Sequence, residues 1–278
     1  MRNKIGMNLL LWGTEITEDL FPVLEEIKST GFDGVEVPVF NVTPAAWKPW
    51  RRKLDELGLD RIAVTINGPD FNQIDPDPFQ RKATLERNKR ALECAAELGS
   101  SLMTGPFHSA LGVFTGKAPR EEELAWCAEN LNTLAEHARA LGITLGLEYL
   151  NRFESYLVSS TDELIALADR VGHPNCKLMF DTFHANIEEK DMSEAIRKMG
   201  SRLVHVQLSE NDRSTLGKGH VDFPRIIGTL SEIGYTGMMS IEAFSPKLAA
   251  ANIWRKMFAS ESQLMKESLS YLKNSISA

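Results

Sequence analysis

Residues 120–150 read REEELAWCAENLNTLAEHARALGITLGLEYL and contain one complete unit of the predicted architecture. The first part, Arg120–Leu141, is rich in Ala, Leu and Glu and has the period of an amphipathic helix. Gly142 follows directly, and glycine accepts the left-handed conformation that closes a last helical turn. The chain then enters Thr144–Leu150, a short apolar run that is typical of a buried strand. This segment therefore predicts a helix that is joined directly to a strand.

The same alternation of short apolar runs and longer amphipathic runs extends along the whole chain. The predicted strands are Ile5–Leu11, Gly34–Val39, Ile62–Asn67, Leu102–Gly105, Thr144–Leu150, Lys177–Asp181, Leu203–Ser209 and Met239–Ala243. The predicted helices are Thr17–Thr30, Ala45–Leu57, Gln80–Leu98, Arg120–Leu141, Thr161–Val171, Met192–Met199, Pro224–Ile233 and Ala249–Lys273. Strands that are each followed by a helix indicate a parallel sheet that closes on itself. We therefore predict an α/β fold, the (β/α)8 TIM barrel.

The domain organisation is predicted to be simple. No Pro/Ser-rich linker or low-complexity segment divides the chain, so residues 1–278 are expected to form a single domain. The alternative is an open, doubly wound sheet, which normally carries a glycine-rich phosphate-binding turn after an early strand. The first predicted strand instead leads into Leu-Leu-Trp-Gly-Thr-Glu at residues 10–15, which favours the barrel.

Composition excludes several classes of protein. The chain has no apolar run of about 18 residues, so no membrane-spanning helix is expected. A net charge of −7 without a block of Lys and Arg argues against non-specific nucleic-acid binding. The basic start Met1–Lys4 is followed too soon by polar residues for a secretory signal, so a cytoplasmic location is expected.

The three cysteines are far apart in the sequence and form no CxxC motif, which argues against a disulfide scaffold or a structural zinc site. Cys94 and Cys127 lie in helical stretches and are expected to be small buried hydrophobic residues.

Polar side chains stand at the ends of the last four predicted strands, where the active site of a parallel barrel lies. These residues are Glu148, Asp181, Gln207 and Glu242. An unpaired buried carboxylate costs several kcal/mol, and three neighbouring carboxylates repel one another. A divalent cation among them would offset both effects, and oxygen-rich sites suit Mg²⁺, Mn²⁺ or Co²⁺. The alternative is that each carboxylate pairs separately with an arginine or a lysine.

Four motifs carry a resemblance to a known family. They are LEYLNRFE at 147–154, FDTFHANIEE at 180–189, HVQLSENDR at 205–213 and IEAF at 241–244. They resemble the ketose 3-epimerases, the D-tagatose/D-psicose 3-epimerase group of the xylose-isomerase-like TIM barrels, and the resemblance runs nearly the full chain. It implies an isomerase that acts on a small-molecule sugar and uses a divalent metal. Mn²⁺ is the expected ion, with Co²⁺ or Mg²⁺ as alternatives, and a homo-oligomer (dimer or tetramer) is expected.

The resemblance also implies roles for individual residues. The family's metal ligands fall on Glu148, Asp181, Gln207 and Glu242. Its two catalytic acids fall on Glu148 and Glu242. Its substrate-contacting residues fall on Glu154, His184 and Arg213. His108 follows the fourth predicted strand and is a further candidate for the wall of the pocket.

The chain departs from the family at Gln207, where the epimerases usually carry histidine. Hydroxypyruvate isomerase-like proteins resemble this chain in using glutamine there, so the exact substrate stays open. His205 is expected to be a packed, hydrogen-bonded histidine rather than a substitute ligand. Glu36 either reaches the site or pairs with an arginine. Three aromatic residues are candidates for an apolar wall or for core packing: Trp12, Phe244 and Trp254.

The function that follows is metal-dependent epimerisation of a free ketose at C3 through a cis-enediolate. The metal would stabilise the developing negative charge. Glu148 and Glu242 would stand on opposite faces of the intermediate, where one removes a proton and the other returns one. The alternative is an aldose–ketose or hydroxypyruvate-type isomerase with the same metal site. A DNA-repair endonuclease on the same barrel would need more histidines, to hold a zinc cluster, than the six in this chain. A non-catalytic sugar-binding protein is a further alternative.

Overall fold

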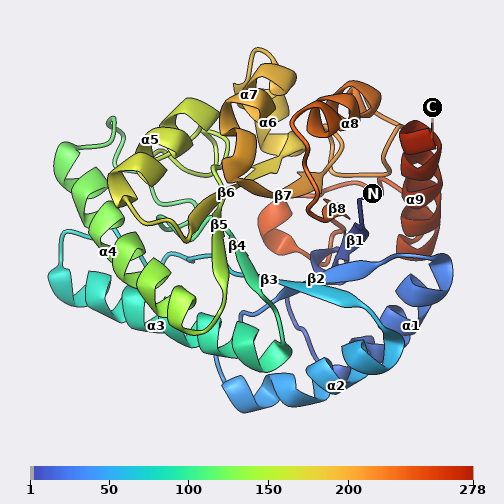
Figure 1. Cartoon of the computed structure of the whole chain (residues 1–278), viewed down its shortest axis with the longest axis horizontal. Helices are drawn as coiled ribbons and strands as arrows, with labels where there is room; N and C mark the ends of the chain where they lie inside the picture. Colours follow the sequence, from blue (N-terminus) through green and yellow to red (C-terminus); the bar gives the residue numbers. More distant parts are fainter. Residues whose placement is uncertain (1–2, 278) are drawn as a thin grey trace.

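The structure, a computed structural model, describes residues 3–277 of the chain. Eight parallel strands pair in chain order, and β1 pairs with β8 as well as with β2, so the sheet is a closed barrel (Figure 1). The strands are β1 Ile5–Asn8, β2 Gly34–Pro38, β3 Asp60–Val64, β4 Leu102–Gly105, β5 Thr144–Leu147, β6 Cys176–Asp181, β7 Leu203–Leu208 and β8 Met239–Ile241. The predicted (β/α)8 TIM barrel is confirmed.

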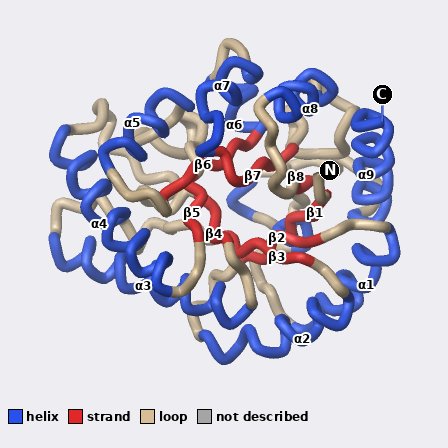
Figure 2. The backbone as a smooth tube through the Cα atoms, in the orientation of Figure 1, coloured by secondary structure: helices blue, strands red, loops and turns tan. Residues whose placement is uncertain are grey.

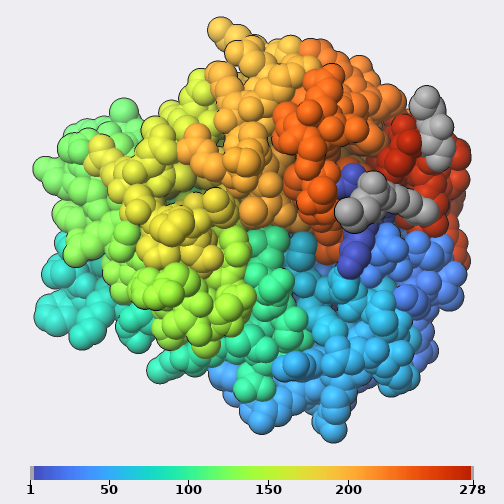
Figure 3. Space-filling view, viewed as in Figure 1, coloured from blue at the N-terminus to red at the C-terminus, as the bar shows by residue number. Residues whose placement is uncertain are grey.

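The helices surround the strands on the outside of the barrel (Figure 2). The α-helices are α1 Phe21–Thr30, α2 Lys48–Leu57, α3 Pro78–Leu98, α4 Glu121–Ala140, α5 Thr161–Val171, α6 Thr182–Glu188, α7 Met192–Met199, α8 Phe223–Glu232 and α9 Glu261–Ser277. The N-terminal half of the chain, blue to cyan in Figure 3, fills the lower side of that view, and the later residues fill the upper side.

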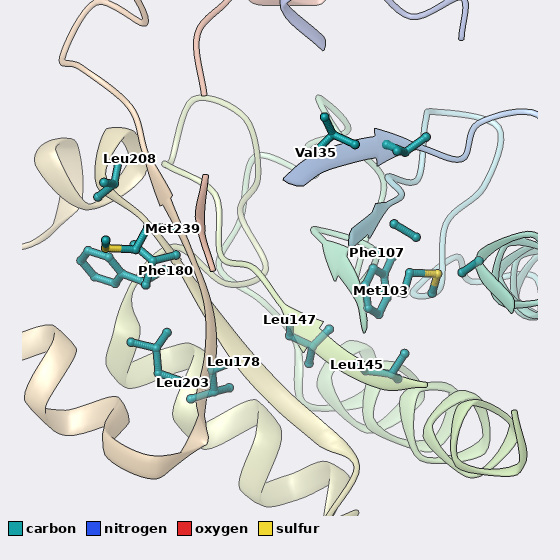
Figure 4. Packing of buried hydrophobic residues seen from close by; sticks show 14 of the residues in the cluster. Val35, Met103, Phe107, Leu145, Leu147, Leu178, Phe180, Leu203, Leu208 and Met239 are labelled. Atoms are coloured by element: carbon teal, nitrogen blue, oxygen red, sulfur yellow. The ribbon is translucent and has the colours of Figure 1, made fainter. Parts of the chain in front are cut away.

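The core consists of the apolar strand residues and the helix faces packed on them. Parallel strands are covered on both faces, which explains why they are almost continuously apolar. Leu178 of β6 is in register with Leu203 of β7, and the two side chains lie together in Figure 4. Leu145 and Leu147 of β5 are fully buried in the same cluster. This packing holds the ends of the strands in fixed positions around the barrel mouth.

Several predicted boundaries differ from the structure, and two of the differences have a clear local cause. β1 ends at Asn8 rather than Leu11, since Asn8 Oδ1 accepts a hydrogen bond from Leu10 N (2.9 Å) and starts a 3-10 helix. The last helix begins at Glu261 rather than Ala249. Asn252 has a left-handed φ of 52° and ends a three-residue 3-10 turn. Ser260 Oγ then accepts from Gln263 N (3.1 Å) at the start of α9.

Helix α6 was not predicted. It starts directly after β6, and Asp181 is its N-cap, since Asp181 Oδ1 accepts from Phe183 N (2.8 Å). The helix places His184 in its first turn, close to the strand end.

Within residues 3–277, none of the helices has both the length and the apolar character needed to cross a bilayer. Met1 and Arg2, part of the basic start, lie outside the described residues. Cys94 and Cys127 are buried as predicted, and Cys176 is buried too.

Candidate active site

A cavity of about 290 Å³ opens where the strands end. This volume suits a small molecule. Its polar wall is formed by residues that lie in or follow the last four strands: Glu148, Glu154, His184, Gln207, Arg213 and Glu242. Its apolar wall includes Leu10, Phe40, Val64, Ile66, Leu111, Leu150, Phe153, Phe183, Phe244 and Leu248. The barrel therefore brings predicted catalytic and substrate-binding residues to one cavity.

Glu148, Asp181 and His184 form a cluster that could hold a metal ion. One ligand atom from each lies within 4.8 Å of the others, and all three residues are buried. His184 Nε2 is 3.5 Å from Glu148 Oε1 and 3.4 Å from Asp181 Oδ2. Among the described residues, Asp181 Oδ2 has no hydrogen-bond partner. An unpartnered buried carboxylate oxygen beside a second carboxylate and an imidazole fits a divalent cation.

Gln207 and Glu242, the other two predicted ligands, line the same cavity. Gln207 Nε2 donates to Glu36 Oε2 (2.8 Å), whereas Gln207 Oε1 has no hydrogen-bond partner within the described part of the chain. The carboxylate of Glu242 accepts from the Arg213 guanidinium and, at Oε1, from Asn8 Nδ2 (3.0 Å). The amide oxygen of Gln207 is thus a further atom that could ligate a cation.

The electrostatics of the cluster favour a positive partner. Burial, together with the charges of Asp181 and Glu242, raises the pKa of Glu148 well above its ordinary value. Burial also raises the pKa of Asp181 to about 6. The pKa of Glu242 is raised by burial as well, and the Arg213 charge opposes this rise. Ionising all three carboxyls is costly without a cation, so the residues present fit a divalent metal.

Arg213 is held in place from several sides. Its backbone has a left-handed φ of 57°, and Phe244 N donates to its carbonyl oxygen (2.9 Å). Its guanidinium carbon lies 3.8 Å from the centre of the Phe183 ring and 4.2 Å from that of Phe244. Such cation–π contacts favour a fixed guanidinium. Arg213 therefore presents a positive charge beside Glu242 at the cavity wall.

Glu154 and His184 are oriented by the same neighbour, Asn151. Asn151 Nδ2 donates to Glu154 Oε1 (2.8 Å), and Asn151 N donates to His184 Nδ1 (3.0 Å). The His184 Nε2 atom consequently faces the carboxylates and Arg213 Nη2, which is 3.2 Å away. Burial and the Arg213 charge lower the pKa of His184 well below its ordinary value, so the ring is neutral.

The structure places four further residues for which the sequence predicted a role in the pocket wall or the core. His108 is not among the described residues that line the cavity, and its ring is fully buried with Nδ1 2.9 Å from Ser109 Oγ. The ring is therefore enclosed by protein rather than presented to the pocket. Trp254 is 85% exposed, so it forms neither a cavity wall nor core. Trp12 packs against the core, and Phe244 lines the cavity.

Glu36 pairs with no arginine among the described residues. Its carboxylate accepts from Asn8 and Gln207 and lies in hydrogen-bond contact with His205 Nε2. His205 is fully buried, as predicted for a packed, hydrogen-bonded histidine.

Asn8 and Asn151 were not predicted from the sequence. Asn151 directly follows the LEYL segment, which was a usable signal, whereas Asn8 contacts Glu242 only because closure of the barrel places β1 beside β8.

Comparisons with known proteins agree with this geometry. Residues 24–275 match the xylose isomerase-like TIM barrel family. The L-ribulose 3-epimerase of Mesorhizobium japonicum is 29% identical over 279 residues, which cover 97% of this chain and 93% of that protein. The D-psicose 3-epimerase of Agrobacterium fabrum is 31% identical over 245 residues, which cover 87% of this chain and 85% of that protein.

A solved structure of L-ribulose 3-epimerase superposes with a TM-score of 0.94 and 27% sequence identity, covering 99% of this chain and 95% of that one. A D-allulose 3-epimerase from Methylomonas sp. gives a TM-score of 0.92 at 27% identity, covering 99% of this chain and 98% of that one. By its sequence pattern, its barrel and these relatives, the chain belongs to the xylose isomerase-like TIM barrel family and, within it, to the ketose 3-epimerases, which are sugar-epimerising isomerases.

Proposed function

We propose that this protein epimerises a free ketose at C3 with the help of a divalent cation. The observation that carries this proposal is a pair of buried oxygen atoms that accept no hydrogen bond from the described residues, Asp181 Oδ2 and Gln207 Oε1, in one site. Both belong to a site that also contains Glu148 and Glu242. Similarity to L-ribulose and D-psicose 3-epimerases supports a sugar as the substrate.

The cation would be held by Glu148, Asp181, Gln207 and Glu242. His184 lies beside this position, and its Nε2 carries the ring proton because Nδ1 accepts from Asn151 N. We propose Mn²⁺, since carboxylate and amide oxygens suit this ion, with Co²⁺ or Mg²⁺ as alternatives. When bound, the cation would polarise the ketone of the sugar and lower the cost of removing the neighbouring C3 proton.

The protein's own side chains perform the proton transfers. One of the two glutamates, as a carboxylate, removes the proton from C3 and leaves a planar cis-enediolate. The other, as a carboxylic acid, returns a proton to the opposite face of C3, so the configuration inverts. Glu148 follows β5 and Glu242 follows β8, so the two approach from different sides of the barrel mouth. Their raised pKa values suit groups that must exist in both protonation states.

The remaining polar residues orient the substrate. Arg213 and His184 present N–H groups toward the space between the two glutamates. Glu154, at the outer part of the wall, is 4.0 Å from Arg213 Nη2 and accepts from Asn151. We propose that these three residues contact sugar hydroxyls. The cytoplasmic location, the single-domain organisation and the dimer or tetramer stay predictions from the sequence.

The decisive experiment incubates the enzyme with Mn²⁺ and fructose, tagatose, ribulose or hydroxypyruvate in D₂O. We expect deuterium at C3 of a ketose with inverted configuration. An aldehyde product would instead assign the isomerase alternative.

Glu148→Gln and Glu242→Gln should each lower kcat by about 10²- to 10⁴-fold, the range for a lost acid–base group. Glu136→Gln, on the exposed face of α4, is the matched control and should keep wild-type turnover. Unchanged turnover in either active-site variant would refute the two-base assignment.

A further inference from the structure

We infer that Glu36 is a positioning residue that orients the side-chain amide of Gln207, so that its oxygen rather than its nitrogen faces the cation position. This inference rests on the proposed metal site. Glu36 lies in β2 and is fully buried, and its carboxylate does not line the cavity. It contacts Gln207 from the side opposite to the cavity, where Gln207 Nε2 donates to Glu36 Oε2 (2.8 Å).

The orientation of the amide follows from a chain of hydrogen bonds that starts at the backbone. Leu10 N can only donate, and it donates to Asn8 Oδ1 (2.9 Å). The other end of the Asn8 amide is therefore its NH₂ group, which donates to Glu36 Oε2 (2.5 Å). Because Glu36 Oε2 is an acceptor, the Gln207 atom that faces it must be a donor nitrogen. The Gln207 oxygen is left on the other side, where it has no partner among residues 3–277.

A flipped Gln207 amide would be unfavourable at both ends. Its oxygen would face the Glu36 carboxylate, so that two acceptors would meet without a proton between them. Its NH₂ group would face the cavity, and an amide nitrogen that carries two protons has no lone pair available for a cation. The contact with Glu36 therefore keeps one of the four proposed ligands in its binding orientation.

Backbone pairing holds this arrangement rigidly. Asn8 and Glu36 are direct partners in the β1–β2 register, and Gln207 is paired with Asp181 in the β6–β7 register. The same Asn8 NH₂ group also donates to Glu242 Oε1 (3.0 Å). One buried carboxylate thus ties the orientation of Gln207 to three strands and, through Asn8, to a second proposed ligand.

Two conservative variants separate orientation from charge. Glu36→Gln removes the negative charge but keeps an oxygen acceptor for Asn8 and Gln207. Its new NH₂ group can face His205 Nε2, because the proton of that ring can move to the unpartnered Nδ1. Glu36→Asp keeps the charge but withdraws the acceptor by about 1.5 Å, the length of one C–C bond, beyond hydrogen-bond reach of Gln207.

The experiment measures the Kd for Mn²⁺ by titration calorimetry on metal-free protein, after circular dichroism has verified that each variant is folded. Loss of a side chain that orients a metal ligand weakens metal binding by about 10- to 100-fold, so we expect this loss for Glu36→Asp. Glu36→Gln should remain within about threefold of wild type. In a Gln207→Ala background, Glu36→Asp should have a much smaller effect on Kd, since the main part of its effect passes through Gln207 and only the contact through Asn8 to Glu242 is left.

Two results would overturn the inference while leaving the proposed function intact. One is wild-type Mn²⁺ affinity in Glu36→Asp. The other is a larger loss in Glu36→Gln than in Glu36→Asp, which would assign the effect to charge. A wild-type protein that binds no Mn²⁺ would instead refute the proposed metal site itself, and the inference with it.

Discussion

Replacement of His108 by glutamine should make the protein less sensitive to acid. The His108 ring is fully buried, and burial lowers its pKa from 6.5 to about 4. In the unfolded chain the ring is in water and accepts a proton near its ordinary pKa. Between pH 6.5 and about pH 4 the unfolded chain therefore holds a proton that the folded chain does not.

The direction of the effect follows from this difference. Above pH 6.5 the His108 ring is neutral in both the folded and the unfolded chain, so its protonation does not affect stability. As the pH drops from 6.5 toward 4, the unfolded chain gains a proton that the folded chain does not, and the free energy of unfolding falls. The full shift corresponds to about 3 kcal/mol of lost stability, and about 2 kcal/mol of it is lost by pH 5. Because solvent does not reach the ring, no discount for screening applies.

Urea unfolding of wild type and His108→Gln at pH 7.5 and pH 5 measures this effect. The packing lost with the ring costs the same at both pH values, so the change in the stability difference isolates protonation. We expect the advantage of wild type over His108→Gln to shrink by about 2 kcal/mol at pH 5. His220→Gln, in an exposed loop, is the control and should show no such change. A stability difference that is identical at both pH values would refute the reasoning.

Two further predictions concern the active site. Arg213→Met removes the positive charge that lowers the pKa of Glu242. The acidic limb of the kcat–pH profile should therefore shift to higher pH by about 1–3 pH units. An unchanged acidic limb would contradict this effect of Arg213 on Glu242. Burial raises the pKa of Asp181 to about 6, and this group must ionise to bind a cation, so the affinity for Mn²⁺ should be weaker at pH 5 than at pH 7 by about tenfold or more. The raised pKa values of Glu148 and Glu242 act in the same direction. Titration calorimetry at both pH values measures this, and equal affinities would exclude Asp181 as a ligand.

The architecture could be predicted because its signal is local. Each helix end with its glycine, as at Gly142, and each apolar run after it can be identified within a window of a few residues. Element ends were predicted less well, in part because a polar side chain can cap a neighbouring segment. Asn8 ends β1 early, and Asp181 starts helix α6 inside a segment that resembles a loop. A cap depends on where one side chain points, which an apolar pattern does not show.

The candidate site could be predicted in part, since a strand end marks which side chains reach the barrel mouth. Glu148, Gln207 and Glu242 line the cavity for this reason. The contacts behind them could not be predicted, because Glu36 contacts Gln207 and Asn8 contacts Glu242 between strands that are distant in sequence. The position of His108 was also unpredictable, because its place after β4 does not show whether the ring faces the cavity or is buried behind it.

The pairing of the first strand with the last has a consequence for how the protein becomes active during synthesis. Asn8 is made among the first residues and Glu242 among the last, and the hydrogen bond between them exists only after β8 has closed against β1. A nascent chain that has not yet reached Glu242 lacks one of the four proposed ligands and one of the two proposed acid–base groups. The proposed site is therefore completed in one late step, when β8 closes the barrel against β1.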